Sequence, residues 1–338
     1  MRRVIPPALA VAIVVLLEAP ALATISSFPT PYGGDMRQQR GRSWRTFRLL
    51  TATIAMVLAW ALPQAEATFP GTNGRILYRD GNDLWTVLPD GSSPVQMTHS
   101  SAIAGADPAW SPDGSKVVFW RSGDLWIVNA DGTGQTNLTN GSNTGTSPDW
   151  SPDGLHIVYV GFNGQLWTID TDGNNAAQLL THAGYGDSEP SWSPDGSSIA
   201  FSAYDPTTHH NDLWVAPSSD LNAPIQITST NAHEYNVGWS PDGTQIIFSR
   251  EGRHSLMDIR TVRSDGTHPH RLTTNPASDT YPSWSPDGTK IAFGSDRSGQ
   301  IDTYVMRADG TRQHRITTVG TVGDAWQPCP AATCPPVT

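Results

Sequence analysis

A five-residue phrase, Trp-Ser-Pro-Asp-Gly, occurs five times along this chain and constrains its fold more than any other feature. The copies begin at Trp110, Trp150, Trp192, Trp239 and Trp284, at intervals of 40, 42, 47 and 45 residues. A shortened sixth copy, Trp326-Gln327-Pro328, starts 42 residues after the fifth. Repeats with a period of roughly 40 to 50 residues are typical of arrays of one supersecondary unit. Residues that recur in every copy are therefore expected to be structural, and functional residues are expected where the copies differ.

Each repeat contains the signals of four β-strands. In the copy at Trp110, the Trp strand is followed by three further strand-like segments at residues 116–120, 124–128 and 135–139. Val, Ile, Phe and Trp favour strands, and the intervening Ser-Pro-Asp-Gly and Asp-Gly sequences favour tight turns. The third segment, Leu125-Trp126-Ile127-Val128, is apolar on both faces, so its sheet must be covered on both sides. Four-stranded sheets arranged in a ring meet this requirement, and the sequence therefore predicts an all-β fold, a β-propeller.

The two ends of the repeat array predict the number of blades and the way in which the ring closes. Residues 73–98 carry a second, third and fourth strand without a Trp strand before them. The segment Asp324-Ala325-Trp326 is a Trp strand with no further strand after it. Together they make one complete blade beside the five complete units. We therefore predict a six-bladed propeller of four-stranded antiparallel blades over residues 68–328, in which a C-terminal strand completes the first blade.

The repeats resemble those of the TolB-like β-propeller family. The resemblance rests on the Trp-Ser-Pro-Asp-Gly copies, on third strands such as Asp83-Leu84-Trp85, and on Ser295-Asp296-Arg297-Ser298-Gly299 after a second strand. It covers about residues 69–328 and implies the propeller without the α/β domain that precedes it in full-length TolB. Similar blades occur beside the hydrolase domain of prolyl oligopeptidase-like peptidases, but the chain contains no Gly-x-Ser-x-Gly nucleophile motif.

Two segments with the form of secretion signals precede the repeats. The first combines Arg2-Arg3 with an apolar run over residues 4–17. The second combines five arginines between residues 37 and 48 with an apolar core over 49–62 and the small-residue site Ala65-Glu66-Ala67. Each apolar run has roughly 14 residues, which is short of the ~20 that span a bilayer as a helix.

We therefore expect residues 1–67 to be a signal region, with translation starting at Met36 and a mature chain that begins at Thr68. The alternatives are that both signals are used, and that the second apolar run stays uncleaved as an anchor. Export implies a periplasmic or extracellular protein, and we expect a monomer without a stable membrane span. Seven of the 21 Lys and Arg residues and three of the 31 Asp and Glu residues precede Thr68, so the mature chain has 14 basic and 28 acidic residues, a net charge of −14. This charge repels phosphates, so we expect no nucleic-acid partner.

Residues 329–338 form a Pro-rich tail that contains the only two cysteines of the chain, Cys329 and Cys334. In an exported protein two cysteines so close together predict a disulfide that closes a small loop. An isolated pair with no histidine nearby is weak evidence for a metal site.

Candidate functional residues lie just before each Trp. In TolB-like propellers the Trp strand is innermost, so these residues would line the mouth of the central channel. The copies differ at the third position before the Trp, where the residues are Asp107, Ser147, Glu189, Asn236, Tyr281 and Gly323. Five positions before each Trp stand Gly105, Gly145, Asp187, Glu234, Asp279 and Thr321. The candidate site residues are Asp107, Asp187, Glu189, His233, Glu234, Asn236, Asp279, Tyr281 and Asp324.

Carboxylates from several blades at one opening have two interpretations. They could hold a cationic ligand or a hard ion such as Ca²⁺, which takes six to eight oxygen ligands. They could equally solvate a loop-rich face of an acidic protein. The adjacent His209-His210 pair lies in the longest hairpin insertion, residues 204–211, and no shared metal is expected there because neighbouring side chains on a strand point in opposite directions.

The leading interpretation is an exported, non-enzymatic scaffold that binds a protein partner or a cell-envelope ligand through its channel face. The alternative is a metal-assisted lyase or hydrolase that acts on an extracellular polymer. An enzyme of that kind requires imidazoles beside the carboxylates to bind the metal and transfer protons, and only His233 stands among them. Fold alone does not decide between these functions.

Overall fold

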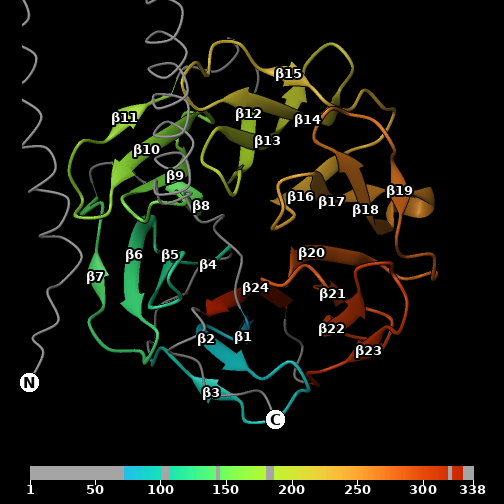
Figure 1. Cartoon of the computed structure of the whole chain (residues 1–338), viewed down its shortest axis with the longest axis horizontal. Coiled ribbons are helices and arrows are strands. Elements are labelled where there is room, and N and C mark those ends of the chain that lie inside the picture. Colours follow the sequence, from blue (N-terminus) through green and yellow to red (C-terminus); the bar gives the residue numbers. More distant parts are fainter. Residues whose placement is uncertain (1–71, 100–106, 142–144, 180–185, 319–321, 330–338) are drawn as a thin grey trace, which may run out of the picture. The chain divides into compact units, whose positions relative to one another are not determined.

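The computed structural model describes residues 72–99, 107–141, 145–179, 186–318 and 322–329, all within a unit that spans residues 64–338. In these residues, twenty-four strands form six four-stranded antiparallel sheets arranged in a ring (Figure 1). The predicted all-β six-bladed propeller is confirmed. The C-terminal strand β24 joins the first blade, as expected from the two ends of the repeat array.

The blades are numbered along the chain, and their strands are given from the channel outwards. Blade 1 contains β24 (Val322–Cys329), β1 (Thr72–Asp80), β2 (Asp83–Val87) and β3 (Val95–Gln96). Blade 2 contains β4 (Ala109–Trp110), β5 (Lys116–Arg121), β6 (Asp124–Asn129) and β7 (Thr136–Asn137), and blade 3 contains β8 (Gly145–Trp150), β9 (His156–Gly161), β10 (Leu166–Asp170) and β11 (Ala177–Gln178).

Blade 4 contains β12 (Gly186–Trp192), β13 (Ser198–Asp205), β14 (His210–Pro217) and β15 (Ile225–Gln226). Blade 5 contains β16 (Glu234–Trp239), β17 (Gln245–Glu251), β18 (Met257–Arg263) and β19 (His270–Arg271), with a short 3-10 turn at Arg253–Ser255 between β17 and β18. Blade 6 contains β20 (Asp279–Trp284), β21 (Lys290–Ser295), β22 (Asp302–Arg307) and β23 (His314–Arg315).

The hydrophobic core lies between neighbouring blades. In the third strand of blade 2, Ile127 packs in a cluster with Tyr159 of blade 3, whereas the next residue, Val128, packs in a cluster with Leu77 of blade 1. Successive strand residues point to opposite faces, so one apolar strand serves two interfaces. The innermost strands contact one another in the closed order β24, β4, β8, β12, β16 and β20.

The residues of the Ser-Pro-Asp-Gly turns recur because each has a structural role in the turn. Ser111 Oγ donates to Asp113 Oδ1 at 2.6 Å and accepts the Lys116 N–H at 2.9 Å. Gly114 has a φ of +67°, a conformation that glycine adopts without steric cost. A Cβ atom at Gly114 would lie 2.0 Å from the Pro328 carbonyl oxygen, because the turn packs tightly on the closing strand. The recurring residues are therefore structural, as expected.

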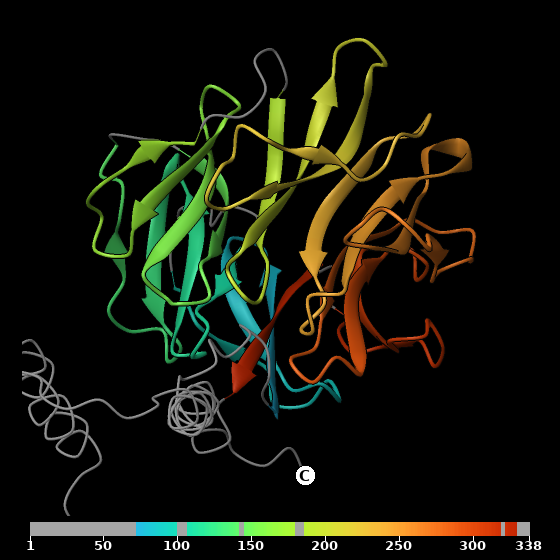
Figure 2. The ribbon, with the colours of Figure 1, turned by 45° about the horizontal axis from the view of Figure 1, so that its top comes forward.

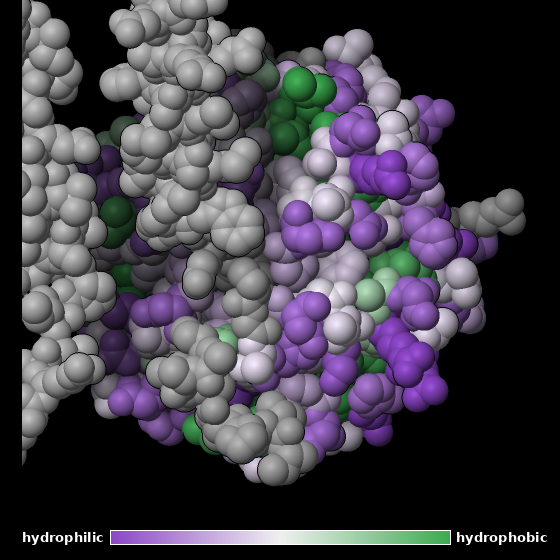
Figure 3. Space-filling view, in the orientation of Figure 1, coloured by the Kyte–Doolittle hydropathy of each residue, from purple (hydrophilic) through white to green (hydrophobic). Residues whose placement is uncertain are grey.

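Hydrophilic side chains predominate over the described surface in the view of Figure 3, and hydrophobic ones show only in separate patches. Within the described residues, no helix is long and apolar enough to cross a membrane.

Candidate functional site at the channel mouth

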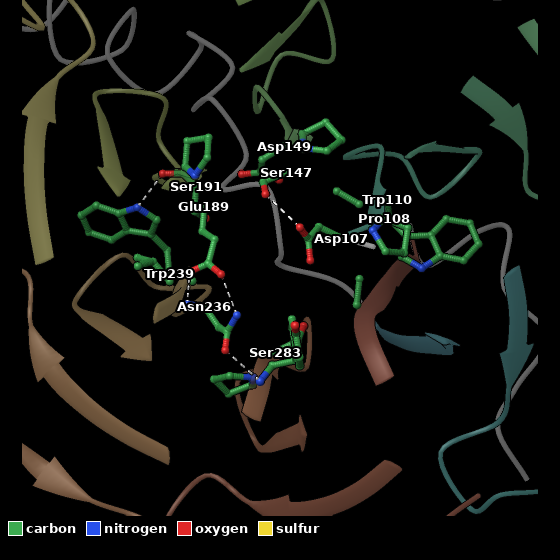
Figure 4. Close-up of a pocket in the computed structure, with 18 of the residues that line it drawn as sticks. Asp107, Pro108, Trp110, Ser147, Asp149, Glu189, Ser191, Asn236, Trp239 and Ser283 are labelled. Carbon is green, nitrogen blue, oxygen red and sulfur yellow. Dashed lines mark hydrogen bonds between the residues drawn. The ribbon is translucent and has the colours of Figure 1, made fainter. Parts of the chain in front are cut away.

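A cavity of about 160 Å³ lies where the innermost strands meet, and all six blades contribute to its lining (Figure 4). Its polar lining includes five residues that stand three positions before a repeat Trp: Asp107, Ser147, Glu189, Asn236 and Tyr281. The structure therefore brings together four of the predicted site residues, Asp107, Glu189, Asn236 and Tyr281. We call these four residues together with Ser147 the rim.

Every rim residue has a left-handed backbone, although none is glycine. The φ angles are +64°, +50°, +51°, +56° and +51° for Asp107, Ser147, Glu189, Asn236 and Tyr281. In blades 3 to 6 the ladder between the first and second strands also shifts its register at the rim residue, which marks a β-bulge. A bulge re-aims the local side chain, and a non-glycine residue held in this region costs on the order of 1–3 kcal/mol. Backbone strain of this kind clusters at functional sites.

Hydrogen bonds join the rim residues across blade boundaries (Figure 4). Ser147 Oγ donates to Asp107 Oδ2 at 2.8 Å. Asn236 donates its backbone N–H to Glu189 Oε2 and its Nδ2 to Glu189 Oε1, the latter at 2.9 Å. The Tyr281 N–H in turn donates to Asn236 Oδ1 at 3.3 Å. The carboxylates of Asp107 and Glu189 are thus held in place by neutral partners.

Asp149 is a third acid in the lining and was missed by the sequence analysis. It stands one position before Trp150, and its Oδ2 accepts the Trp192 N–H at 2.8 Å. An alignment of the repeats at this position would have shown it as the only carboxylate among Ala109, Asp149, Ser191, Gly238, Ser283 and Ala325.

The three lining acids have raised pKa values because the channel removes them from water. Burial raises the pKa of Glu189 to about 7; the negative charge of Asp107 acts in the same direction, and the hydrogen bonds from Asn236 oppose it. Burial also raises the pKa of Asp149 to about 6 and raises that of Asp107. The described lining of the cavity includes no Lys, Arg or His side chain to compensate them.

The predicted acids five positions before each Trp do not line the cavity. Glu234 and Asp279 are fully buried, and each faces an arginine of its own blade: Arg250 at 3.7 Å from Glu234 and Arg297 at 2.9 Å from Asp279. Asp187 is also buried, at 3 % exposure. In a regular strand these residues would share a face with the rim. The bulge separates the two positions, so that one faces the channel and the other the interior of the blade.

The remaining sequence candidates fall outside the cavity or outside the described residues. His233 interacts with Asn211 on the neighbouring blade, at 3.1 Å between Nδ1 and Oδ1. Asp324 belongs to β24, but its side chain is outside the described part of the structure. Cys329 is buried at the end of β24, and Cys334 lies outside the described residues, so their disulfide stays a prediction. Among the described residues no group of three or more His, Cys, Asp or Glu side chains is placed to hold a metal ion.

The sequence of this propeller matches the family model described as the TolB beta propeller domain over residues 92–257 and 163–329. The chain belongs to this family. No curated protein matches it in sequence. Among solved structures it is similar to a putative TolB from Agrobacterium tumefaciens, with a TM-score of 0.63 and 20 % identity over 74 % of this chain and 91 % of that one.

Two further solved structures share the fold at low identity. TolB from Acinetobacter baumannii matches with a TM-score of 0.64 and 20 % identity over 79 % of this chain and 70 % of that one. An oligogalacturonate lyase in complex with manganese matches more weakly, with a TM-score of 0.51 and 18 % identity over 74 % of each chain. At these identities the solved structures share the propeller fold with this chain.

Proposed function

We propose that this TolB-like propeller is a non-enzymatic binding protein whose channel mouth takes a cationic group of a protein partner. The observation that carries the proposal is the convergence of Asp107, Asp149 and Glu189 on one cavity whose described lining contains no basic side chain. Burial raises the pKa of Asp107 and outweighs the charge of Arg79, which lowers it. No basic residue in the described part of the chain contributes to the pKa shifts of Asp149 and Glu189. Partly buried carboxylates with so little counter-charge are unfavourable in the free protein, and an ammonium or guanidinium group offsets that cost.

The raised pKa values give this binding a characteristic pH dependence. A cation binds the ionised carboxylates, so binding releases the proton that Glu189, with a pKa of about 7, holds in part at neutral pH. The affinity is therefore expected to increase from pH 5.5 to pH 8.

The alternative of a metal-assisted lyase or hydrolase is less well supported by the same cavity. The described lining contains no histidine, which such an enzyme would need to bind its metal and transfer protons. The substrate named for the similar lyase, an oligogalacturonate, is itself a polyanion. Three carboxylates in the cavity would repel it.

The test uses isothermal titration calorimetry with a terminally blocked Gly-Gly-Lys-Gly-Gly peptide at low ionic strength. We expect the lysine peptide to bind and the same peptide with norleucine in place of lysine not to bind. Glu189→Gln or Asp149→Asn should weaken binding about tenfold or more. A hydrogen bond to a charged group contributes at least this factor to the binding constant.

Asp172→Asn serves as the control, because it removes an exposed carboxylate from an Asp-Gly turn outside the cavity. It should leave binding unchanged. Equal binding of the lysine and norleucine peptides would refute the proposal. A second outcome would also refute it. If millimolar calcium raises the melting temperature, if this rise depends on Glu189, and if the peptide does not bind, a metal rather than a cationic side chain would occupy the mouth.

A further inference from the structure

Five aromatic or imidazole rings lie on the β13–β14 hairpin and at the start of β16, in two groups. His210, His233 and Tyr235 form a row, and Tyr204 and His209 form a separate pair. The ring centroids of His210 and His233 lie 5.3 Å apart, and those of His233 and Tyr235 lie 5.8 Å apart with nearly parallel planes, 12° from one another. Tyr204 and His209 form a second ring pair at 6.4 Å. We call this set the ring ladder.

Hydrogen bonds hold the ring ladder in place while leaving part of it open to solvent. Tyr204 Oη lies 3.0 Å from His209 Nδ1, and the Asn211 N–H donates to His233 Nδ1 at 3.2 Å. Tyr204 is 37 % exposed and His209 is exposed, while His210, His233 and Tyr235 are partly exposed. His210 Nδ1 is buried without a hydrogen-bond partner in the described structure.

The ring ladder ends one residue before the rim, although its rings do not line the cavity. Tyr235 directly precedes the rim residue Asn236, which binds Glu189 through two hydrogen bonds. Burial raises the pKa of the Tyr235 hydroxyl, and the negative charges of Glu251 and Glu189 raise it further. The rings and the rim therefore occupy neighbouring positions of the same strand, β16.

The ladder is particular to blade 4 and its boundary with blade 5. β13 and β14 contain eight residues each, whereas the corresponding strands of blade 3 contain six and five. Their hairpin projects beyond its neighbours in the view of Figure 2. The corresponding loop of blade 3 carries one isolated aromatic residue, Phe162, which is 85 % exposed.

We propose that the ring ladder is a subsite for a flat aromatic side chain of the same partner, adjacent to the basic residue that enters the channel. This inference rests on the proposed function. An aromatic side chain stacks, or packs edge to face, on another ring. The carboxylates of Asp205 at the end of β13 and of Glu251 at the end of β17 favour a partner that also carries positive charge. A peptide with adjacent basic and aromatic residues meets both requirements.

The experiment compares two blocked peptides, Gly-Gly-Lys-Phe-Gly-Gly and Gly-Gly-Lys-Ala-Gly-Gly, by calorimetry. The unchanged protein should bind the Lys-Phe peptide about 3- to 10-fold more tightly, as expected for one additional aromatic contact. His210→Ala or Tyr235→Ala should abolish this preference, whereas Tyr235→Phe, which keeps the ring, should retain it. If either alanine variant has a lowered melting temperature, His233→Ala replaces it, because the His233 ring lies between those of His210 and Tyr235 in the same row.

Phe162→Ala is the matched control, since it removes an exposed aromatic side chain from the equivalent hairpin of the neighbouring blade. It should keep the preference for the Lys-Phe peptide. Equal affinities of the two peptides for the unchanged protein, or a preference that survives the ladder substitutions, would overturn the subsite while leaving the proposed function intact. The subsite would also be overturned if the protein bound neutral cellohexaose but not the Lys-Phe peptide, and if the ladder substitutions abolished the cellohexaose binding. Failure of both lysine peptides to bind would instead refute the proposed function.

Discussion

Five residues of this propeller combine a strained backbone with a side chain in the central cavity. Asp107, Ser147, Glu189, Asn236 and Tyr281 differ in chemistry but share the left-handed conformation and the position three residues before a Trp. The backbone conformation is common to these five blades, and only the side chain differs between them. The repeat thus provides equivalent positions around one cavity, where a substitution changes the chemistry offered to a ligand and leaves the blade as it is.

At the scale of single residues, the raised pKa values predict an unusual pH dependence of stability. Glu189 and Glu234 both have pKa values of about 7 in the folded protein, raised mainly by burial from an ordinary value of 4.5. Between these values the folded state holds protons that the unfolded state has released, so the free energy of unfolding falls as the pH rises. From pH 5.5 to pH 8 we expect a loss of about 1–2 kcal/mol per group.

Urea unfolding at the two pH values measures this loss. Glu189→Gln should reduce it, because glutamine does not titrate. Asp172→Asn should leave it unchanged, because the hydrogen bonds from Asn174 hold the pKa of that exposed carboxyl below its ordinary value, outside this pH interval. A stability that rises over this pH interval would contradict the assignment.

At the scale of elements, the strand β24 determines whether the ring is closed. It pairs with β1 and contacts β4 and β20 on its two sides. Its Trp326 is 1 % exposed, and Gln327 Nε2 donates to the Gly114 carbonyl oxygen at 2.9 Å. The strand thus joins blade 1 to blade 2 as well as completing its own sheet.

Deletion of residues 321–338 should therefore open the propeller. The edge of β1 and the surfaces that packed on Trp326 would become exposed, and unpaired edges favour aggregation. We expect the melting temperature to fall sharply and the truncated protein to aggregate on heating. The point variant Trp326→Ala should cost about 3–5 kcal/mol, measured by urea unfolding. A truncated protein as stable and soluble as the full chain would mean that other contacts close the ring.

At the scale of the whole molecule, charge is distributed unevenly around the ring. Residues 68–244 contain four Lys and Arg and 19 Asp and Glu residues, a net charge of −15, whereas residues 245–338 contain ten and nine, a net charge of +1. The cavity acids Asp107, Asp149 and Glu189 come from blades 2, 3 and 4, within the acidic part. A field of this kind increases the association rate of a cationic partner and is screened by salt.

We propose that the protein is exported, as the two signal-like segments before the propeller suggest. Expression of the full chain in a bacterial host with a secretion system should give a product whose N-terminus is Thr68, because Ala65-Glu66-Ala67 has the form of a cleavage site. N-terminal sequencing of the exported fraction measures this. A product that still begins before Leu49 would contradict cleavage at that site.

The sequence by itself determined the repeat unit, the number of blades and the strand that closes the ring. These follow from local signals that recur at a fixed period: a Trp strand, a Ser-Pro-Asp-Gly turn and a strand that is apolar on both faces. The position three residues before each Trp also predicted four of the five rim residues. A ring of equivalent strands must bring equivalent positions to its axis.

Only the tertiary structure decided which acids face the channel. Glu189 and Asp187 are two residues apart and would share a face in a regular strand, but the bulge turns Glu189 to the cavity and leaves Asp187 buried at 3 % exposure. The bulge uses non-glycine residues, so no local signal marks it. The ring ladder is also tertiary, since His233 and His210 are 23 positions apart in the sequence and meet only because blades 4 and 5 are neighbours. Strand periodicity describes one sheet, whereas contacts between sheets depend on how the blades pack.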